Sequence, residues 1–284
     1  MKKILKAIIP TIFIAVLLSS TLVRADYSVV VGNTFDYDVG ASNWDVTLGT
    51  DTSTGTGFQF LGVNKPVGTT FDVEVTAVDA LLGVDWDMTV GTDVDPGSNS
   101  PFDALGVLFM LILPVFFAEA IVGSWDQAEM DLGPELMTFF FVDPVAWSDF
   151  FYEISQEAFI SSITDQDYEF VNVGGTFDNS TSVAVFTWHF DMTYTSIGYD
   201  YSGTFVWMYA FDKNNGHMKG TYMDMDYTGT VASEALTYKL EQRVEEVGYN
   251  LPAVGGFIPG FEWFIAIPAL VLLGGIAIII RKRK

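Results

Sequence analysis

Hydrophobic and polar residues alternate with a period of two along much of this chain, as in a β-strand with one buried and one exposed face. In the first third, the alternation is clearest over residues 35–39, 44–48, 71–77 and 84–90, where Phe, Tyr, Trp and Val alternate with Asp, Glu and Thr. The connections contain Gly, Asn, Ser and Pro, and they are too short for the helical crossovers of a parallel sheet. The sequence therefore predicts an antiparallel meander.

The same period returns after residue 167 with larger aromatic side chains. One strand is expected to bury Phe186, Trp188, Phe190, Met192 and Tyr194, and the next Tyr201, Phe205, Trp207, Tyr209 and Phe211. Residues 212–216 (Asp-Lys-Asn-Asn-Gly) predict a hairpin turn. Residues 233–247 fit a helix or an edge strand, and the nearly unbroken alternation favours the strand. We expect a mainly β fold, a curved antiparallel meander that is half-barrel or barrel-like, with a deep aromatic inner face.

Residues 101–163 interrupt this pattern as a helical and apolar insert. Residues 105–118 carry no charge, but the run is too short for a membrane span and contains Gly106 and Pro114. It is expected to be a buried helix or irregular lid, or else the lining of a pocket for an apolar ligand. In that second interpretation the pocket is lined by four residues: Leu108, Phe109, Phe205 and Trp207.

Two helices are expected in the rest of the insert. A capping box at residues 124–127 predicts a short helix that ends at Gly133-Pro134. A longer helix is predicted to begin at Pro144, with Asp143 as its N-cap. Apolar residues recur along it at helical spacing, namely Trp147, Phe150, Phe151, Ile154, Ala158 and Phe159. These aromatic faces need a sheet to pack against, so the insert is expected to cover the meander.

Both ends of the chain predict export and a membrane anchor. Residues 1–25 have the lysine-rich start, apolar stretch and small-residue end of a signal peptide, with an uncleaved anchor as the alternative. Residues 263–280 form an uncharged apolar run that approaches the ~20 residues of a membrane-spanning helix. Residues 248–262 read as a linker, and the basic residues 281–284 are expected to face the cytoplasm. The predicted ectodomain, residues 26–247, would then lie outside the cell on a single-pass anchor.

The charge distribution restricts the partners of this ectodomain. All 36 acidic residues lie between Asp26 and Glu262, whereas most of the 13 basic residues lie at the two ends. Such an acidic region repels phosphate backbones, so no nucleic acid partner is expected. The chain has no cysteine, which excludes disulfides and thiolate zinc sites.

Few residues point to catalysis. His189 and His217 stand apart from any serine elbow or metal-binding pair, and the phosphate-binding and dinucleotide-binding motifs are absent. Both histidines are expected to be exposed strand residues, and the chain is not expected to be an enzyme. A pair of carboxylates of the glycosidase type remains open, because sequence does not give the separation between acids.

Short motifs suggest two kinds of surface site, one for calcium and one for a glycan. Acidic residues recur at a spacing of two, and the loop that contains Asp93, Asp95 and Asn99 is similar to the opening of a calcium loop, although it lacks the later glutamate. The alternative is that these acids form the solvent face of strands. Asn179-Ser180-Thr181 is a glycosylation sequon in a turn-like stretch, so Asn179 is a candidate glycan site.

The end of the chain resembles a known sorting signal. Pro259-Gly260-Phe261, the apolar run and the closing basic cluster are similar to the PGF-CTERM signal of archaeal cell-surface proteins. The resemblance implies recognition by an archaeosortase, removal of the helix and attachment to a membrane lipid near the motif. The chain departs from the pattern because the usual Thr-rich spacer is missing, which bears on processing more than on attachment. The ectodomain is similar in style to archaeal surface ectodomains, which implies no particular activity.

These features together predict a membrane-anchored extracellular surface protein. We expect a β-rich, non-enzymatic domain that binds an apolar ligand or lipid between sheet and insert, with no cofactor other than Ca²⁺. One alternative is a structural component of the cell envelope, bridged by cations through its acidic face. A second alternative is a surface hydrolase that uses carboxylates.

Overall fold

The structure is a computed structural model that describes most of the predicted ectodomain. The described residues are 27–253, except for 81, 101–102, 104–106, 108–110, 112–129, 165–168 and 197. The predicted signal peptide, the sorting motif and the predicted membrane helix lie outside this range. Within the described residues, no helix has the length and hydrophobicity needed to cross a bilayer.

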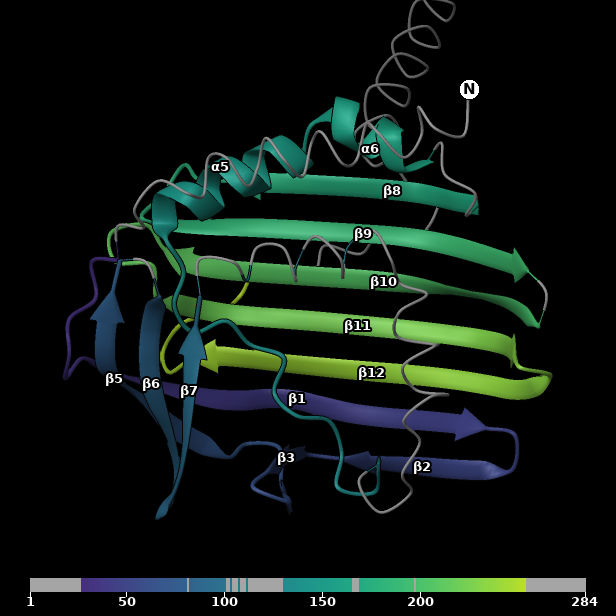
Figure 1. Ribbon diagram of the computed structural model, residues 1–284, viewed down its shortest axis with the longest axis horizontal. Helices are drawn as coiled ribbons and strands as arrows, with labels where there is room; N and C mark the ends of the chain where they lie inside the picture. Colours follow the sequence, from purple (N-terminus) through teal and green to yellow (C-terminus); the bar gives the residue numbers. More distant parts are fainter. Residues whose placement is uncertain are drawn as a thin grey trace, which may run out of the picture. The chain divides into compact units, whose positions relative to one another are not determined.

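The chain is mainly β, as the alternation predicted, and most of its strands belong to one large antiparallel sheet (Figure 1). The first strands are β1 (Thr34–Leu48), β2 (Asp51–Thr56), β3 (Phe58–Phe60), β4 (Val63–Lys65), β5 (Thr70–Asp79), β6 (Gly83–Val90) and β7 (Asp93–Asn99). The later strands are β8 (Glu169–Asp178), β9 (Val183–Ser196), β10 (Tyr199–Asp212), β11 (Met218–Val231) and β12 (Glu234–Glu246). The sheet has the order β7-β6-β5-β1-β12-β11-β10-β9-β8, β2 pairs with β1, and β3 with β4 form a separate hairpin.

Strand β1 joins the two halves of the sheet. Its one edge pairs with β12 from Tyr37 to Leu48, although the two strands are separated by almost the whole ectodomain. Its other edge is shared, because residues 34–38 pair with β5 and residues 43–48 pair with β2. The register with β12 shifts between Val39 and Ala41. This shift lies between the residues of β1 that pair with β5 and those that pair with β2. Beyond that point β5, β6 and β7 run steeply across the direction of the other strands (Figure 1).

Two predictions about the strands are wrong in detail. Residues 35–39 and 44–48 belong to one long strand, because the break at Gly40 is a β-bulge and not a turn. The sheet is also not a simple meander, because β12 returns to pair with β1. The strand that the alternation favoured at residues 233–247 is confirmed by β12. The hairpin at residues 212–216 is also confirmed, with Gly216 at a φ of 76°.

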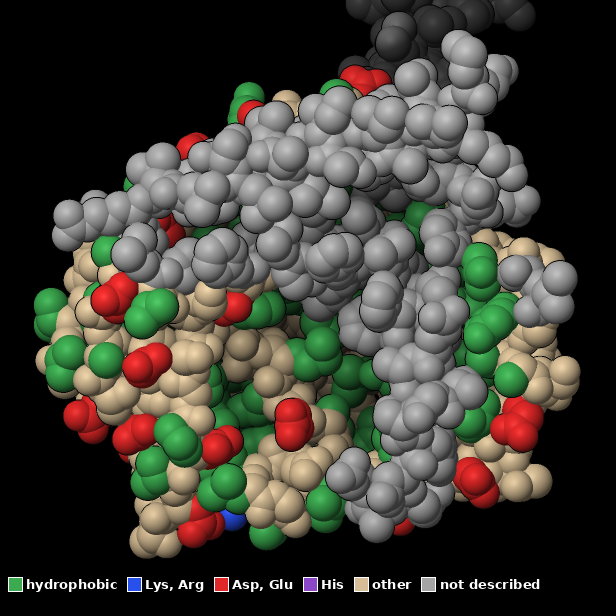
Figure 2. Space-filling view, in the orientation of Figure 1, with side chains coloured by type: hydrophobic (Ala, Val, Ile, Leu, Met, Phe, Trp, Pro, Cys, Tyr) green, Lys and Arg blue, Asp and Glu red, His purple; other side chains and the backbone are tan. Residues whose placement is uncertain are grey.

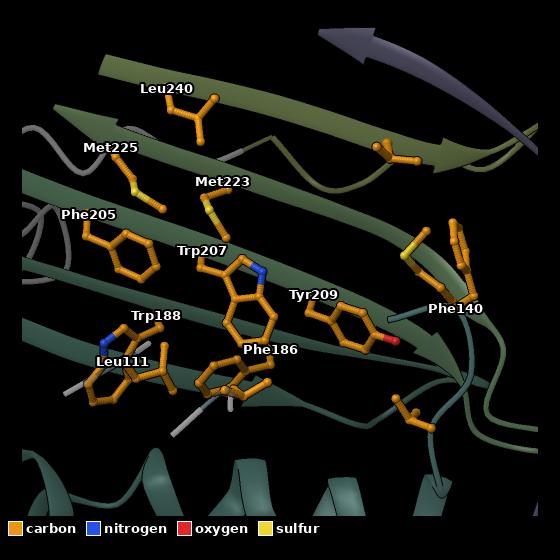
Figure 3. Close-up of a cluster of buried hydrophobic side chains, with 14 of the residues drawn as sticks. Leu111, Phe140, Phe186, Trp188, Phe205, Trp207, Tyr209, Met223, Met225 and Leu240 are labelled. Carbon is orange, nitrogen blue, oxygen red and sulfur yellow. The ribbon is translucent and has the colours of Figure 1, made fainter. Parts of the chain in front are cut away.

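We call the side of the sheet that carries the aromatic residues the inner face. One row across it, from β9 to β1, consists of Trp188, Trp207, Met223, Gln242 and Ser42. The next row consists of Phe190, Phe205, Met225, Leu240 and Trp44. Nearly all of these side chains are buried and belong to one hydrophobic cluster. Figure 3 shows several of them on the same side of their strands.

Large aromatic rings on this sheet lie over glycines of the neighbouring strand. Four such cross-strand pairs are Trp44 with Gly55, Trp86 with Gly97, Trp188 with Gly175, and Tyr227 with Gly203. In each pair a Cβ on the glycine would overlap the ring. The missing side chain therefore provides the space in which the ring lies flat on the sheet.

Two helices of the insert pack on the inner face beside β8 and β9 (Figure 1). Helix α5 (Pro144–Ile154) begins as predicted, because the carboxylate of Asp143 accepts hydrogen bonds from the amides of Val145 and Ala146. The Phe151 ring of α5 stacks on Phe186 of β9, with centroids 4.2 Å apart. Helix α6 (Glu157–Thr164) places Phe159 against Trp188. The helix predicted to begin at residue 124 starts outside the described residues.

The packing of rings on glycines predicts a cost for adding a side chain at Gly203. The new methyl group of Gly203→Ala would overlap the Tyr227 ring and the carbonyl oxygen of Asp226. We expect a loss of about 1–3 kcal/mol in the free energy of unfolding, as for other overpacked sites. Urea unfolding of the full-length chain, followed by near-UV circular dichroism, measures this loss.

Gly40→Ala is the matched control, because its nearest contact would be an ordinary 3.7 Å to Cδ of Arg243. Equal losses for the two variants would show that the ring of Tyr227 does not need the space above Gly203.

Candidate ligand-binding face

The inner face is crossed by a segment that begins with a turn and continues without regular secondary structure, residues 130–142, which we call the strap. It runs from the hairpin of β3 and β4 to the start of α5 (Figure 1). At its first end, the amide of Asn64 donates to the carbonyl of Leu132, and the backbone amide of Gln59 donates to that of Pro134. At its far end, Phe141 forms an isolated β-bridge with His217. The strap is therefore anchored at both ends by the sheet and its hairpins.

Gln242 holds the middle of the strap. Its side chain is 1% exposed and stands among apolar residues on the inner face of β12. The side-chain oxygen accepts from the backbone amide of Met137 at 2.7 Å, and the side-chain nitrogen donates to the carbonyl of Glu135 at 3.0 Å. The hydroxyl of Tyr209 also donates to the carbonyl of Phe139. These bonds satisfy strap backbone groups that would otherwise lie unpaired over an apolar surface.

Asn99 fixes the strap to the edge strand β7. Its side-chain oxygen accepts from the indole of Trp86 at 3.1 Å and from the backbone amide of Phe141 at 3.0 Å. Its side-chain nitrogen donates to the carboxylate of Asp103 at 3.3 Å. Burial raises the pKa of Asp103, which the hydrogen bonds from Ser100 and Asn99 partly offset. This network is structural, since each polar atom serves a neighbouring element.

A hollow opens on this side of the molecule. Figure 2 shows it over β12 and β1, with hydrophobic side chains inside it and acidic residues around the surrounding surface. The strands below it contribute buried apolar residues to the inner face, including Met225, Leu240 and Trp44. Such a hollow suits a ligand whose surface is mostly apolar.

Some buried polar atoms of the inner face have no hydrogen-bond partner. The indole nitrogen of Trp188, the hydroxyl of Tyr227 and the hydroxyl of Ser42 are three groups that find no partner among the described residues. Leaving a buried donor unpaired costs about 1–3 kcal/mol, so groups of this kind call for a partner. The indole of Trp188 can only donate, whereas the two hydroxyls can donate or accept. A bound molecule with acceptor oxygens would satisfy them.

The structure describes two of the four residues that were predicted to line a ligand pocket. Phe205 and Trp207 both lie on the inner face and are buried, with the indole nitrogen of Trp207 donating to the hydroxyl of Thr221 at 3.1 Å. Leu108 and Phe109 lie outside the described residues. Their neighbours Val107 and Leu111 are helical and fully buried in the same cluster.

His217 is buried, so its expected exposure is wrong. Its ring stacks on Phe35 at 4.2 Å between centroids, and Nε2 lies 3.3 Å from a carboxylate oxygen of Glu246. Glu246 also forms an ion pair with Lys219. Burial lowers the pKa of His217, helped by Lys219 and opposed by Glu246 and Asp212. The strap bridges the strand at this position, and Phe141 of the strap also contacts Phe35.

His189 is half-buried, which also differs from the expected exposure. Its ring lies over Gly174 of the neighbouring strand, in the same manner as the aromatic rings described above. Burial lowers the pKa of His189, and the nearby carboxylate of Asp191 opposes this effect.

The three predicted calcium ligands do not form one site. Residues 93–99 form strand β7 and not a loop, so Asp93 and Asn99 stand about 20 Å apart at the rise of an extended strand. Asp93 pairs with Lys65 at 3.5 Å, and the amide of Asn99 is occupied by Trp86, Phe141 and Asp103. Among the residues that the structure describes, no group of three or more acidic or histidine side chains gathers to hold a metal.

The candidate glycosylation site is accessible. Asn179 is exposed in the turn between β8 and β9, and its carbonyl accepts from the side-chain nitrogen of Lys213. Its amide side chain therefore stays a candidate for glycan attachment.

Gln242 and Tyr227 were not predicted to be important polar groups of this face, and Asn99 was predicted as a calcium ligand and not as an anchor of the strap. Gln242 carried a signal, because it falls on the apolar side of β12 between Leu240 and Val244. A polar residue at such a position indicates a buried hydrogen bond. Tyr227 gave no comparable signal, since tyrosines fit either face of a strand.

Comparison with known proteins gives no relative from which a function can be transferred. No protein-family model, curated protein or solved structure matches the chain.

Replacing Gln242 should loosen the strap. Gln242→Leu leaves the amide of Met137 and the carbonyl of Glu135 without their partner, at about 1–3 kcal/mol for each unpaired buried group. We expect faster hydrogen exchange at Met137 than in the wild type, together with a lower melting temperature.

The control is Glu241→Leu, which changes the adjacent residue on the opposite face of β12. The carboxylate of Glu241 accepts a solvent-exposed hydrogen bond from the side chain of Asn43 and does not touch the strap. The hydrogen exchange at Met137 should therefore stay unchanged in this variant. Unchanged exchange in both variants would contradict the role of Gln242 as an anchor.

Acid should destabilise the fold through His217. Its pKa in the folded state lies below the ordinary value, so the unfolded state binds the proton more readily. The stabilisation is complete above pH of about 6.5 and is lost as the pH falls towards the lowered pKa. Melting temperatures between pH 7.5 and pH 5 should fall less in His217→Gln than in the wild type. Equal falls would contradict the assignment, since His189 is retained in both proteins.

Proposed function

We propose that this protein is an exported, membrane-anchored surface protein that holds a lipid or another apolar ligand on its inner face. The described strands form an open sheet, and β5–β7 turn across one end of it (Figure 1). In this proposal the sheet acts as a half-barrel, and the insert covers the ligand. The proposal assigns no enzymatic step to the protein.

The observation that carries the proposal is the hollow with hydrophobic side chains in Figure 2. Water in contact with such a surface is unfavourable, so an apolar molecule gains free energy by displacing it. The unpartnered indole nitrogen of Trp188 supports the same conclusion, because a core that is complete by itself would satisfy this donor.

The predicted anchor is consistent with a lipid ligand. The linker of residues 248–262 and the apolar run of residues 263–280 would hold the domain next to a bilayer. The start of the linker is docked on the sheet, because Leu251 packs against Gly220 and its amide donates to the carboxylate of Glu245. In this proposal, processing by an archaeosortase would replace the protein anchor by a lipid and leave the ligand site unchanged.

An envelope component bridged by cations is the alternative, and one observation favours it. Carboxylates face each other directly across strands on the outer face: Asp36 with Asp72, Glu74 with Asp87, and Asp224 with Glu241. Like charges in such pairs are destabilising, and cations, including Ca²⁺, would relieve the repulsion. The hydrolase alternative has no comparable support, because Asp103 and Asp143 both accept hydrogen bonds from nearby backbone amides.

Photo-crosslinking in membranes tests the lipid proposal. The full-length chain is reconstituted into vesicles that contain a phospholipid with a diazirine in its acyl chain, and the labelled peptides are identified by mass spectrometry. We expect labelling of peptides from β11 and β12, whose inner faces carry Met225 and Leu240 below the hollow.

Peptides of the outer surface near Asp36 and Asp72 serve as the internal control, because these exposed acids should not meet an acyl chain. Labelling confined to residues 263–280 would contradict the proposal and leave the envelope alternative.

A further inference from the structure

Four large apolar residues are exposed on the side of the domain that lies below β1 in Figure 1. We call them the apolar edge: Leu61, Val63, Val67 and Val94, with exposed fractions of 55%, 52%, 40% and 48%. The first two belong to the hairpin of β3 and β4, the third follows β4, and the last lies near the start of β7. Figure 2 shows hydrophobic side chains along the same lower side of the molecule. Unlike the residues of the inner face, these side chains are accessible from outside.

An ion pair joins the two parts of the apolar edge. Nζ of Lys65 in β4 lies 3.5 Å from a carboxylate oxygen of Asp93, the residue before Val94. The same Nζ lies 5.8 Å from the ring centroid of Phe60, so the lysine packs over the hairpin. Because the two charges offset each other, this pair adds no net charge to the apolar edge of an otherwise acidic domain.

Leu61 occupies a position in which leucine is unfavourable. Phe60 pairs with Val63, so Leu61 and Gly62 form the two-residue turn of the hairpin, and their φ angles are 48° and 72°. Such a turn favours asparagine, aspartate or glycine, because a side chain with a Cβ is strained at a positive φ. The Leu61 side chain is also more than half exposed, so it adds little to the core. Neither the turn nor the packing of the domain explains this leucine, whereas an apolar partner outside the domain would.

The start of the linker is docked at the bulge of β1. The amide of Leu251 donates to the carboxylate of Glu245, and the carbonyl of Leu251 accepts from the guanidinium of Arg243 at 3.1 Å. The side chains of Arg243 and Glu245 lie over Gly40, at 3.7 and 3.8 Å from the position that a Cβ on this glycine would take. The chain therefore leaves the domain beside the bulge.

The same bulge holds the segment that carries the apolar edge. The amide of Gly68 donates to the carbonyl of Val39 at 2.8 Å, and the amide of Val39 donates to the carbonyl of Thr69 at 3.2 Å. Gly68 and Thr69 directly follow Val67 in the sequence. Residues 252–262 connect the docked end of the linker to the predicted membrane helix, and they can span at most about 40 Å. A bilayer that holds the anchor thus lies within reach of this side of the domain.

We infer that the apolar edge inserts into the surface of the lipid bilayer beside the membrane anchor, with Leu61 at the tip of the contact. Exposed apolar side chains gain free energy when they leave water for the acyl region of a membrane. The contact is apolar, because anionic head groups would repel the acidic domain. This inference rests on the membrane anchor of the proposed function and not on the ligand of the inner face. It adds that the bulge of β1 and the hairpin of β3 and β4 face the membrane.

Spin labelling in membranes tests this inference. The chain has no cysteine, so a single introduced cysteine gives one unique site for a nitroxide. The full-length Leu61→Cys variant is reconstituted into phosphatidylcholine vesicles. The accessibility of its label to oxygen, which concentrates in the bilayer, is then compared with its accessibility to a water-soluble nickel chelate. We expect an oxygen-to-nickel ratio at least threefold higher than that of a label at an exposed control position.

Leu82→Cys is the matched control. Leu82 is also a leucine in a hairpin turn, between β5 and β6, and it is 78% exposed. It lies at the other end of β6 from the turn that precedes β7, about 25 Å away at the rise of an extended strand. Its label should stay in water.

A second variant separates membrane contact from folding. Leu61→Asn, made in a chain that is labelled at Val63→Cys, introduces a residue that suits the turn. The melting temperature should therefore stay the same or rise, while the oxygen-to-nickel ratio of the Val63→Cys label should fall about twofold, because the tip of the contact has become polar. An unchanged ratio would contradict a contact between Leu61 and the bilayer.

The possible results distinguish this inference from the proposed function. Equal ratios for Leu61→Cys and Leu82→Cys would overturn the inference and leave the anchor intact. Shielding of the Leu61→Cys label from both reagents, with spin–spin broadening between labels, would also overturn it, because a second copy of the chain would then cover the apolar edge. Failure of the chain to float with the vesicles would overturn the anchor of the proposed function, and this inference with it.

Discussion

The pairing of β1 on both of its edges is the constraint on which the rest of the structure depends. One edge holds β12 and through it the aromatic strands β8–β11, while the other edge holds β5 for its first part and β2 for its last. The bulge at Gly40 separates these two partners. Without β1 the sheet would fall into two smaller sheets, and neither would carry the strap that joins them.

The strap and the inner face depend on each other. Phe140 of the strap packs against Tyr37 of β1 and Trp86 of β6, at 5.3 and 4.9 Å between centroids, and so fills the angle where β5–β7 turn across the sheet. Gln242 and Asn99 then hold the strap backbone. Within the part of the chain that the structure describes, the strap groups are thus paired, whereas the indole nitrogen of Trp188 has no hydrogen-bond partner.

Several elements could be predicted from local sequence. The start of α5 depends on Asp143 before Pro144, and the turn after β10 depends on Gly216 at a positive φ. Strand β12 was predicted from an alternation within its own residues. The errors concern contacts between distant segments. His217 was expected to be exposed because it lies just past a hairpin turn, whereas the strap, some seventy residues earlier, bridges its strand and its ring stacks on Phe35.

The sequence by itself determined the strand content, the aromatic composition of one face and the local signals that begin and end elements, because these depend on the spacing of neighbouring residues. Only the tertiary structure decided that β12 pairs with β1, that Gln242 binds the strap, and that Asp93 and Asn99 are too far apart to share an ion. The physical reason is that a strand edge can pair with any other free edge. Which edges meet is fixed by the packing of the whole domain and not by any local pattern.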